Sequence, residues 1–192
     1  ISVQRIVAHR SLYEELKARL VTATEALKAG NPQDEDTFIS PVISEADAKR
    51  IVAWMDEAVT GGAQLLCGGQ REDSLVQASL LEGVDHKAKL WCEEVFGPVA
   101  CLAPFDTFEE AIAEANNSRF GLQVGVFTPR LDRALAAWDN IEAGGVVVGD
   151  VPSWRVDHMP YGVVKDSGFG REGIRYSKES MTELRLLVIR QP

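Results

Sequence analysis

Apolar residues along this chain follow two different spacings. Several segments carry an apolar residue every three or four positions, which is the period of a helix with one buried face. Others are short apolar or alternating runs, which are typical of strands. Helices are predicted from residue 11, from residue 44 and over residues 108–117, 131–141 and 172–182, and strands over residues 2–8, 63–67, 98–105, 122–128 and 146–148. Because strands and helices alternate closely, the pattern predicts an α/β fold: a mostly parallel sheet with helices on both faces.

Capping boxes mark where three of these helices should begin. An acid follows a capping side chain after three residues at Ser11 and Glu14, at Ser44 and Asp47, and at Asp106 and Glu109. The expected inner faces of the first two helices are Leu12, Leu16, Leu20, Ala23 and Leu27, and Ile51, Val52, Met55 and Val59.

The composition narrows the class of protein. A chain of 192 residues can form one good-sized domain, and 45% hydrophobic and 26% charged residues are ordinary for a globular protein. The net charge of −9 argues against nucleic acid or an anionic membrane surface as a partner. No apolar run approaches the length of a membrane span, and no signal peptide is evident.

The cysteines and histidines do not form a metal-ligand pattern, so no metal is expected. The residues in question are Cys67, Cys92, Cys101, His9, His86 and His158. An odd number of cysteines without tight spacing fits a reduced, cytoplasmic protein. Neither Cys92 nor Cys101 has a base in a nucleophile-like context, so both are predicted to be small buried apolar side chains.

Two adjacent carboxylates stand at the middle of the chain, ahead of an aromatic residue and a Gly-Pro corner. The stretch reads Glu93-Glu94-Val95-Phe96-Gly97-Pro98-Val99. Adjacent acids repel unless one faces solvent and the other has a dedicated hydrogen-bond donor. Phe96 could fill the core or present a flat surface to a ring-shaped ligand. The residues alone leave open whether this is a solvated acid pair beside a core phenylalanine or a binding site.

Two later segments also carry functional expectations. Residues 150–170 have no regular period but are rich in large side chains, and a long irregular loop inside a compact domain is usually functional. Residues 184–189, from Leu184 to Ile189, are strongly apolar and would form an exposed edge strand unless they pair. A second copy of the chain is the expected partner, which predicts a homo-oligomer.

Four stretches, in order, resemble signature blocks of the NAD(P)-dependent aldehyde dehydrogenase superfamily. The central stretch resembles its EE-[IV]-FGP-V signature. Residues 117–128 resemble its N…GL…VFT segment, residues 144–148 its GG-V-V strand, and residues 160–172 its P-F-G-G-x-K-x-S-G-x-G-R-E block. The resemblance covers essentially the whole chain. It implies a catalytic domain over residues 1–182 and an oligomerisation strand over residues 183–192.

The resemblance implies the oxidation of an aldehyde to a carboxylic acid with NAD or NADP. In such enzymes a cysteine thiolate attacks the aldehyde, hydride transfer leaves a thioester, and a glutamate activates water. In the family register the cysteine immediately precedes Ile1, and the general base and the dinucleotide-binding domain lie farther upstream. No catalytic residue is therefore expected in this chain, which should be inactive alone. The alternative is a non-catalytic folding or assembly fragment.

The resemblance also implies binding roles. Glu94 is expected to accept hydrogen bonds from the nicotinamide ribose hydroxyls, and Phe96 to lie near the nicotinamide ring, whereas Glu93 is structural or solvated. Residues 150–161 match the loop at which the aldehyde enters. Tyr161, which replaces a commoner Phe, would line the aldehyde tunnel. The candidates for binding the far end of the substrate are Trp154, Arg155 and His158.

Arg155 has two interpretations. It could bind a carboxylate- or phosphate-bearing aldehyde, because guanidinium binds such groups bidentately, or it could form an ion pair with Asp157 or Asp150. Lys165 and Arg171 are expected to hold this loop by hydrogen bonding.

Two residues depart from the family pattern. Gly149 stands in place of a common Asn, and Val163 in place of a common Gly. Because valine disfavours a positive φ, the second departure bears on the backbone shape beside Tyr161.

Overall fold

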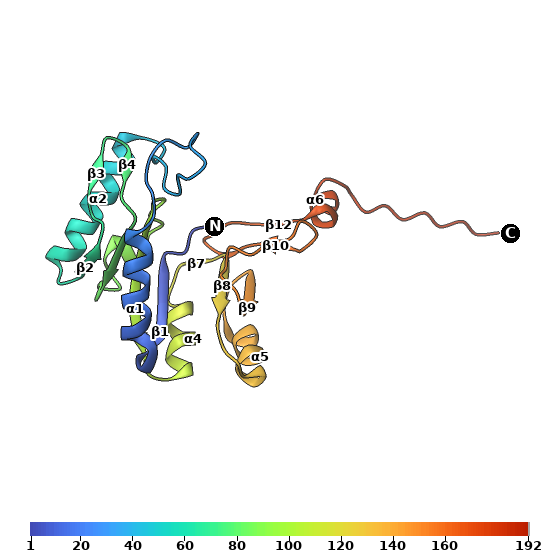
Figure 1. The fold of residues 1–192 in the computed structure, drawn as a ribbon. Helices are drawn as coiled ribbons and strands as arrows, with labels where there is room; N and C mark the ends of the chain where they lie inside the picture. The colour runs from blue at the N-terminus through green and yellow to red at the C-terminus, as the bar shows by residue number, and fades with distance from the viewer. Residues whose placement is uncertain (192) are drawn as a thin grey trace. The chain divides into compact units, whose positions relative to one another are not determined.

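A four-stranded sheet organises the first part of the chain in the computed structural model, which describes residues 1–191 (Figure 1). The strands in spatial order are β1 (Arg5–His9), β6 (Val99–Phe105), β5 (Ser79–Glu82) and β2 (Gln64–Cys67). β6 runs parallel to β1 and to β5, and β2 is antiparallel to β5. The register pairs Arg5 with Cys101 and Ser79 with Val99, so the start of the chain lies against the strand that follows the central stretch.

Helices cover both faces of this sheet. Leu80 and Leu102 pack in one core with residues of α1 (Arg10–Glu25). Leu81 and Cys101, each one position away on the same strands, pack in the other core with residues of α2 (Glu45–Thr60). Successive side chains of a strand point to opposite faces, so each strand contributes to two cores. The predicted α/β architecture, with a mostly parallel sheet between helices, is confirmed.

The helix starts show where the capping predictions hold. Ser44 caps α2 as predicted, and its Oγ accepts a hydrogen bond from the Asp47 N–H at 3.1 Å. The prediction at Ser11 is wrong: α1 begins at Arg10, and its cap is His9, whose Nδ1 accepts from the Ser11 N–H.

The third box is displaced by one residue. At the start of α4 (Phe108–Asn116), Thr107 Oγ1 accepts from the Glu110 N–H at 3.2 Å, and the Glu110 carboxylate accepts from the Thr107 N–H at 3.3 Å. The pair is therefore Thr107 with Glu110, in place of the predicted Asp106 with Glu109, which preserves the same three-residue spacing.

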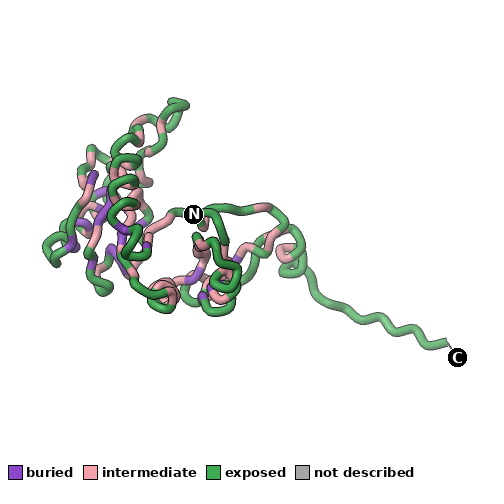
Figure 2. The backbone as a smooth tube through the Cα atoms, turned by 60° about the horizontal axis from the view of Figure 1, so that its bottom comes forward, coloured by how far each residue is buried: buried purple, intermediate pink, exposed green. Residues whose placement is uncertain are grey.

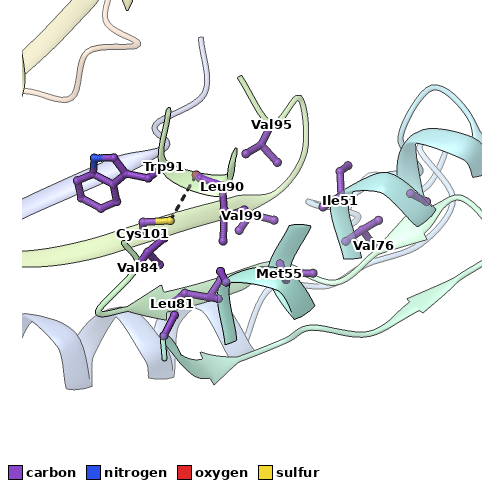
Figure 3. Packing of buried hydrophobic residues seen from close by; sticks show 13 residues of the cluster. Ile51, Met55, Val76, Leu81, Val84, Leu90, Trp91, Val95, Val99 and Cys101 are labelled. Carbon is purple, nitrogen blue, oxygen red and sulfur yellow. Dashed lines mark hydrogen bonds between the residues drawn. The ribbon is translucent and has the colours of Figure 1, made fainter. Parts of the chain in front are cut away.

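The predicted buried faces of α1 and α2 are correct in part: Leu16 and Leu20 of α1 and Val52 of α2 pack against the two cores. On α1, Leu12 is 60% exposed and Tyr13 is buried, and on α2, Val59 is exposed and Ala58 is buried. Ile51 and Met55 lie in the core as predicted (Figure 3). Small side chains such as Ala58 let a helix approach a sheet closely, which a count of large apolar residues does not register. β2, which lies within the strand predicted over residues 63–67, is an edge strand with Gln64 and Leu65 exposed.

The connections between α2 and β6 include one hairpin and one short helix. A hairpin of β3 (Arg71–Glu72) and β4 (Leu75–Val76) lies between β2 and β5. A single helical turn, α3 (Lys89–Cys92), leads into the central stretch, which then enters β6.

The chain divides into two compact units, the first of which is Ile1–Glu114. The second unit, from Ala115 onward, contains a parallel pair of strands joined by a helix: β8 (Gln123–Val126), α5 (Leu131–Asn140) and β9 (Gly145–Val148). Two antiparallel pairs follow: β7 (Phe120–Gly121) with β11 (Val164–Lys165), and β10 (Tyr161–Gly162) with β12 (Arg171–Glu172). The last helix is α6 (Ile174–Ser180).

Residues 184–189 follow α6 and are exposed throughout (Figure 2). No described strand of the chain pairs with them, so their pairing with a second copy stays a prediction. None of the described helices is long and apolar enough to span a membrane.

Candidate functional site

Val95 anchors the central stretch. Its side chain is 1% exposed and lies in the α2-side core with Leu90 and Val99 (Figure 3). Its N–H donates to Gln4 Oε1 at 3.1 Å, and its carbonyl accepts from Arg50 Nη2 at 2.9 Å. Both the side chain and the two backbone polar groups of this residue are therefore held.

Glu94 and Phe96, on either side of Val95, are exposed. The Phe96 side chain is 74% exposed, so the interpretation of Phe96 as a core residue is wrong. Its φ of 52° lies in the left-handed region, which costs a non-glycine residue about 1 kcal/mol or more. The Glu94 side chain makes no hydrogen bond or ion pair with another described residue. An exposed carboxylate and an exposed aromatic ring thus flank one fixed residue.

Gln4 and Arg5 hold the segment before Val95. Gln4 Nε2 donates to the carbonyl of Leu90 at 3.1 Å and to that of Glu93 at 2.7 Å. Arg5 donates to the Trp91 carbonyl from Nε at 3.0 Å and from Nη2 at 2.6 Å. These partners are 86 to 89 positions apart in the sequence, so no local pattern marks Gln4 or Arg5.

Arg5 keeps its charge in a partly buried place. Its guanidinium carbon lies 5.0 Å from the centre of the Trp91 ring. Burial lowers the pKa of Arg5, and the negative charge of Glu114 opposes that shift. A partly desolvated guanidinium makes stronger hydrogen bonds than a solvated one, which suits a structural role in holding the Trp91 carbonyl.

Two of the three cysteines, Cys67 and Cys101, are buried free thiols. Cys101 is fully buried, burial raises the pKa of its thiol to about 12, and its Sγ donates to the Leu90 carbonyl at 3.8 Å. Burial also raises the pKa of Cys67. The predicted burial of Cys101 is confirmed. Cys92 is only half-buried, because the short helix α3 leaves its side chain near the surface, so the prediction is wrong for this residue.

Arg155 contacts two residues of its own unit. Its guanidinium carbon lies 4.2 Å from the centre of the Tyr161 ring, and its Nη2 is 2.8 Å from Glu172 Oε2. An ion pair is therefore present, but the predicted partners Asp157 and Asp150 are wrong. The reason is the β10–β12 ladder, which pairs Tyr161 directly with Glu172 and so brings both to Arg155.

The other candidates of this loop differ in exposure. Tyr161 is half-buried, whereas Trp154 and His158 are exposed. Among the predicted site residues, Arg155 and Tyr161 therefore contact each other. Glu94 and Phe96 are exposed on either side of the buried Val95.

The prediction that Lys165 and Arg171 hold the loop of residues 150–161 is wrong, because their hydrogen bonds go to other segments. Lys165 Nζ donates to the carbonyls of Asn116 and Ser118 at 2.9 and 3.1 Å and pairs with Glu142 at 2.7 Å. Arg171 Nη1 donates to the carbonyls of Val163 and Gly170, both at 2.8 Å.

Gly149 and Val163, the two departures from the family pattern, have backbone conformations that cause no strain. The non-glycine residues with positive φ in the described chain are Asp73, Phe96 and Lys165, so Val163 takes an ordinary conformation. Gly149 has a φ of 84°, in a region that asparagine also tolerates.

Comparison with known proteins identifies the family. Residues 1–187 match the sequence model of the aldehyde dehydrogenase family. The chain is 44% identical to 3-sulfolactaldehyde dehydrogenase of Priestia aryabhattai over 189 aligned residues. The aligned region is 98% of this chain and 40% of that protein.

Two solved structures are similar. The structure of aldehyde dehydrogenase 21 of Physcomitrella patens, in complex with the reaction product succinate, matches this chain with a TM-score of 0.96 and 45% sequence identity. The matched region is 97% of this chain and 39% of the Physcomitrella patens chain. The structure of glyceraldehyde-3-phosphate dehydrogenase GapN of Methanocaldococcus jannaschii, complexed with NADP, matches this chain with a TM-score of 0.90 and 37% sequence identity. The matched region is 94% of this chain and 39% of the GapN chain. The chain spans 40% of the length of the first relative and 39% of each of these structures. With a family match over nearly all of its length, the chain belongs to the aldehyde dehydrogenase family.

Proposed function

We propose that this chain forms the part of an NAD- or NADP-dependent aldehyde dehydrogenase that holds the nicotinamide ribose and the far end of the aldehyde. The whole enzyme oxidises an aldehyde to a carboxylic acid. The observation that carries the proposal is the Glu94 carboxylate, which is exposed, has no partner among the described residues and extends from the backbone beside the anchored Val95.

The residues around Val95 fit the ribose end of a dinucleotide. A carboxylate accepts hydrogen bonds from two adjacent hydroxyls at once, and Glu94 is free to do so. Phe96 offers an exposed aromatic face beside it. A backbone that is already held loses little conformational entropy when a ligand binds, which favours affinity. NAD or NADP, when bound, supplies the hydride acceptor.

The nucleophile is assigned outside the described residues. Cys67 and Cys101 are buried thiols with raised pKa values, and a thiol, unlike a thiolate, is a poor nucleophile. We assign the reactive cysteine to the position before Ile1 and the general base to a farther upstream segment. We also assign residues 1–182 to the catalytic domain and residues 183–192 to subunit pairing.

Arg155 favours an aldehyde that carries an anionic group. Its side chain is 37% exposed and is oriented by the Tyr161 ring, so a substrate anion can replace Glu172 as its partner. The names of three relatives agree: one acts on 3-sulfolactaldehyde, one holds succinate as its product, and one is named for glyceraldehyde 3-phosphate. Each of these compounds bears a sulfonate, carboxylate or phosphate.

The first experiment measures intact mass and aldehyde-dependent formation of NADH or NADPH on the same samples. One sample is the full-length protein and the other is the 192-residue chain. Turnover by the full-length protein and none by the chain is the expected result. Turnover by the chain alone would overturn the assignment of the nucleophile, and no turnover by the full-length protein would overturn the proposed activity.

The second experiment compares 3-sulfolactaldehyde with lactaldehyde, which lacks only the sulfonate. The Arg155→Met variant should raise the KM for 3-sulfolactaldehyde about tenfold or more and leave that for lactaldehyde within about twofold. Arg175→Met is the matched control, because Arg175 is exposed and pairs only along α6 with Glu179 among the described residues. Equal effects of Arg155→Met on the two aldehydes would contradict the proposed substrate class.

A further inference from the structure

One side chain, Gln4, binds the backbone on both sides of Glu94. Its Nε2 donates to the Glu93 carbonyl at 2.7 Å, and its Oε1 accepts from the Val95 N–H at 3.1 Å. The Glu93 carbonyl belongs to the peptide group before Glu94, and the Val95 N–H belongs to the peptide group after it. Holding both planes fixes the two backbone dihedral angles that lie between them, φ and ψ of Glu94.

The same carboxamide has its hydrogen-bonding groups in use. The second hydrogen of Nε2 goes to the Leu90 carbonyl at 3.1 Å. Glu94 itself lies outside any helix or strand, so no ladder orders its backbone. Gln4, half-buried just before β1, therefore orders the backbone of this stretch as a neighbouring strand would.

We propose that Gln4 is a positioning residue that sets the direction of the Glu94 carboxylate and thereby the affinity for the dinucleotide. The inference rests on the proposed function, in which Glu94 accepts hydrogen bonds from the ribose hydroxyls. Gln4 touches no ligand in this arrangement and acts only through the two peptide groups that bound Glu94. Arg5 binds the Trp91 carbonyl in α3, so the start of the chain also holds the helical turn that leads into this stretch.

The test uses the full-length protein and measures the Kd for NAD and NADP by calorimetric titration without aldehyde. Gln4→Glu is nearly isosteric but replaces Nε2, which donates both hydrogen bonds, by one oxygen that faces the carbonyls of Leu90 and Glu93. It should raise the Kd about tenfold or more. Gln77→Glu, at an exposed loop position with the same change of charge, is the control and should leave the Kd unchanged.

A double-mutant cycle separates positioning from a general loss of structure. If Gln4 acts through the Glu94 carboxylate, Gln4→Glu should change the Kd by less than about twofold in a Glu94→Gln background. If Gln4→Glu changed the Kd by the same factor in the wild type and in the Glu94→Gln background, the inference would be overturned. Gln4→Asn, which keeps the amide but is shorter, provides a neutral second variant and should give an intermediate Kd.

Acidification gives an independent readout. Lowering the pH protonates the carboxyl introduced by Gln4→Glu and restores one donor, so the ratio of variant to wild-type Kd should fall as the pH falls. A wild-type protein that binds neither dinucleotide would overturn both proposals. A wild type that binds while Gln4→Glu binds equally well would overturn this inference alone.

Discussion

A Cβ atom on Gly97 would lie 2.5 Å from Cδ1 of Ile51, closer than two carbon atoms can approach. Ile51 is fully buried on α2, and Gly97 forms the corner between Phe96 and β6. Gly97 does not have a positive φ, so the requirement for glycine at this corner is one of space and not of backbone conformation. The corner that follows Phe96 thus lies directly on α2.

Gly97→Ala should lower the free energy of unfolding by about 1–3 kcal/mol, because the added methyl overpacks the core. Ile51→Val removes Cδ1 and should cost about 1 kcal/mol alone. Since the valine leaves room for the new methyl, the double variant should be more stable than the sum of the two losses predicts. Urea unfolding of the four proteins measures the coupling, and strict additivity would show that Ile51 is not the obstacle.

Stability should fall at alkaline pH because of Cys101. Burial raises the pKa of its thiol from 9.0 to about 12, so the folded state keeps a proton that the unfolded state loses in this range. The contribution is fully present below pH 9.0 and is lost as the pH rises toward about 12, by at most about 1.4 kcal/mol per pH unit.

Cys101→Ala isolates this effect from other groups that titrate at high pH. The difference in free energy of unfolding between wild type and variant should shrink as the pH rises from about 9 to about 10.5. Tyr13, whose pKa burial also raises, is present in both proteins and cancels in the difference. Parallel loss of stability in the two proteins would contradict the assignment to Cys101.

Lys165→Met should destabilise the second unit. The substitution removes two hydrogen bonds to backbone carbonyls and the ion pair with Glu142, at a side chain that is 23% exposed. The loss of these interactions should cost about 1–3 kcal/mol in total, even though the Asn116 carbonyl keeps its hydrogen bond from the Ser118 N–H. Hydrogen exchange should therefore speed up in β7 and β11, while the exposed control Lys178→Met changes neither strand. Unchanged hydrogen exchange in both strands would mean that Lys165 does not stabilise the pairing of β7 with β11.

The apolar segment 184–189 should mediate subunit pairing. Leu184 is fully exposed and Leu186 is 87% exposed, and such a run is expected to be covered by a partner. Leu186→Asp should lower the mass measured by light scattering on the full-length protein, because the interface would have to bury an unpaired charge. Leu12→Asp, at an exposed leucine of α1, is the control. An unchanged assembly mass in the Leu186→Asp protein would count against pairing through this segment.

Much of the fold could be predicted from local patterns. The alternation of strands and helices and the cap at Ser44 both depend on residues close together in sequence. The buried faces of the helices were harder to predict from the sequence. On α2, Ala58 is buried and Val59 is exposed, because the burial of each residue depends on how closely the helix approaches the sheet.

The sequence by itself determined the family, the sheet between helices and the choice of Glu94, Phe96 and Arg155 as candidates, because these depend on short motifs and periods. Only the tertiary structure decided what holds them. Gln4 reaches Glu93 across 89 positions, and Arg155 finds Glu172 through the pairing of β10 with β12. Such partners are set by strand register and by the packing of distant segments, and a short motif carries no information about either.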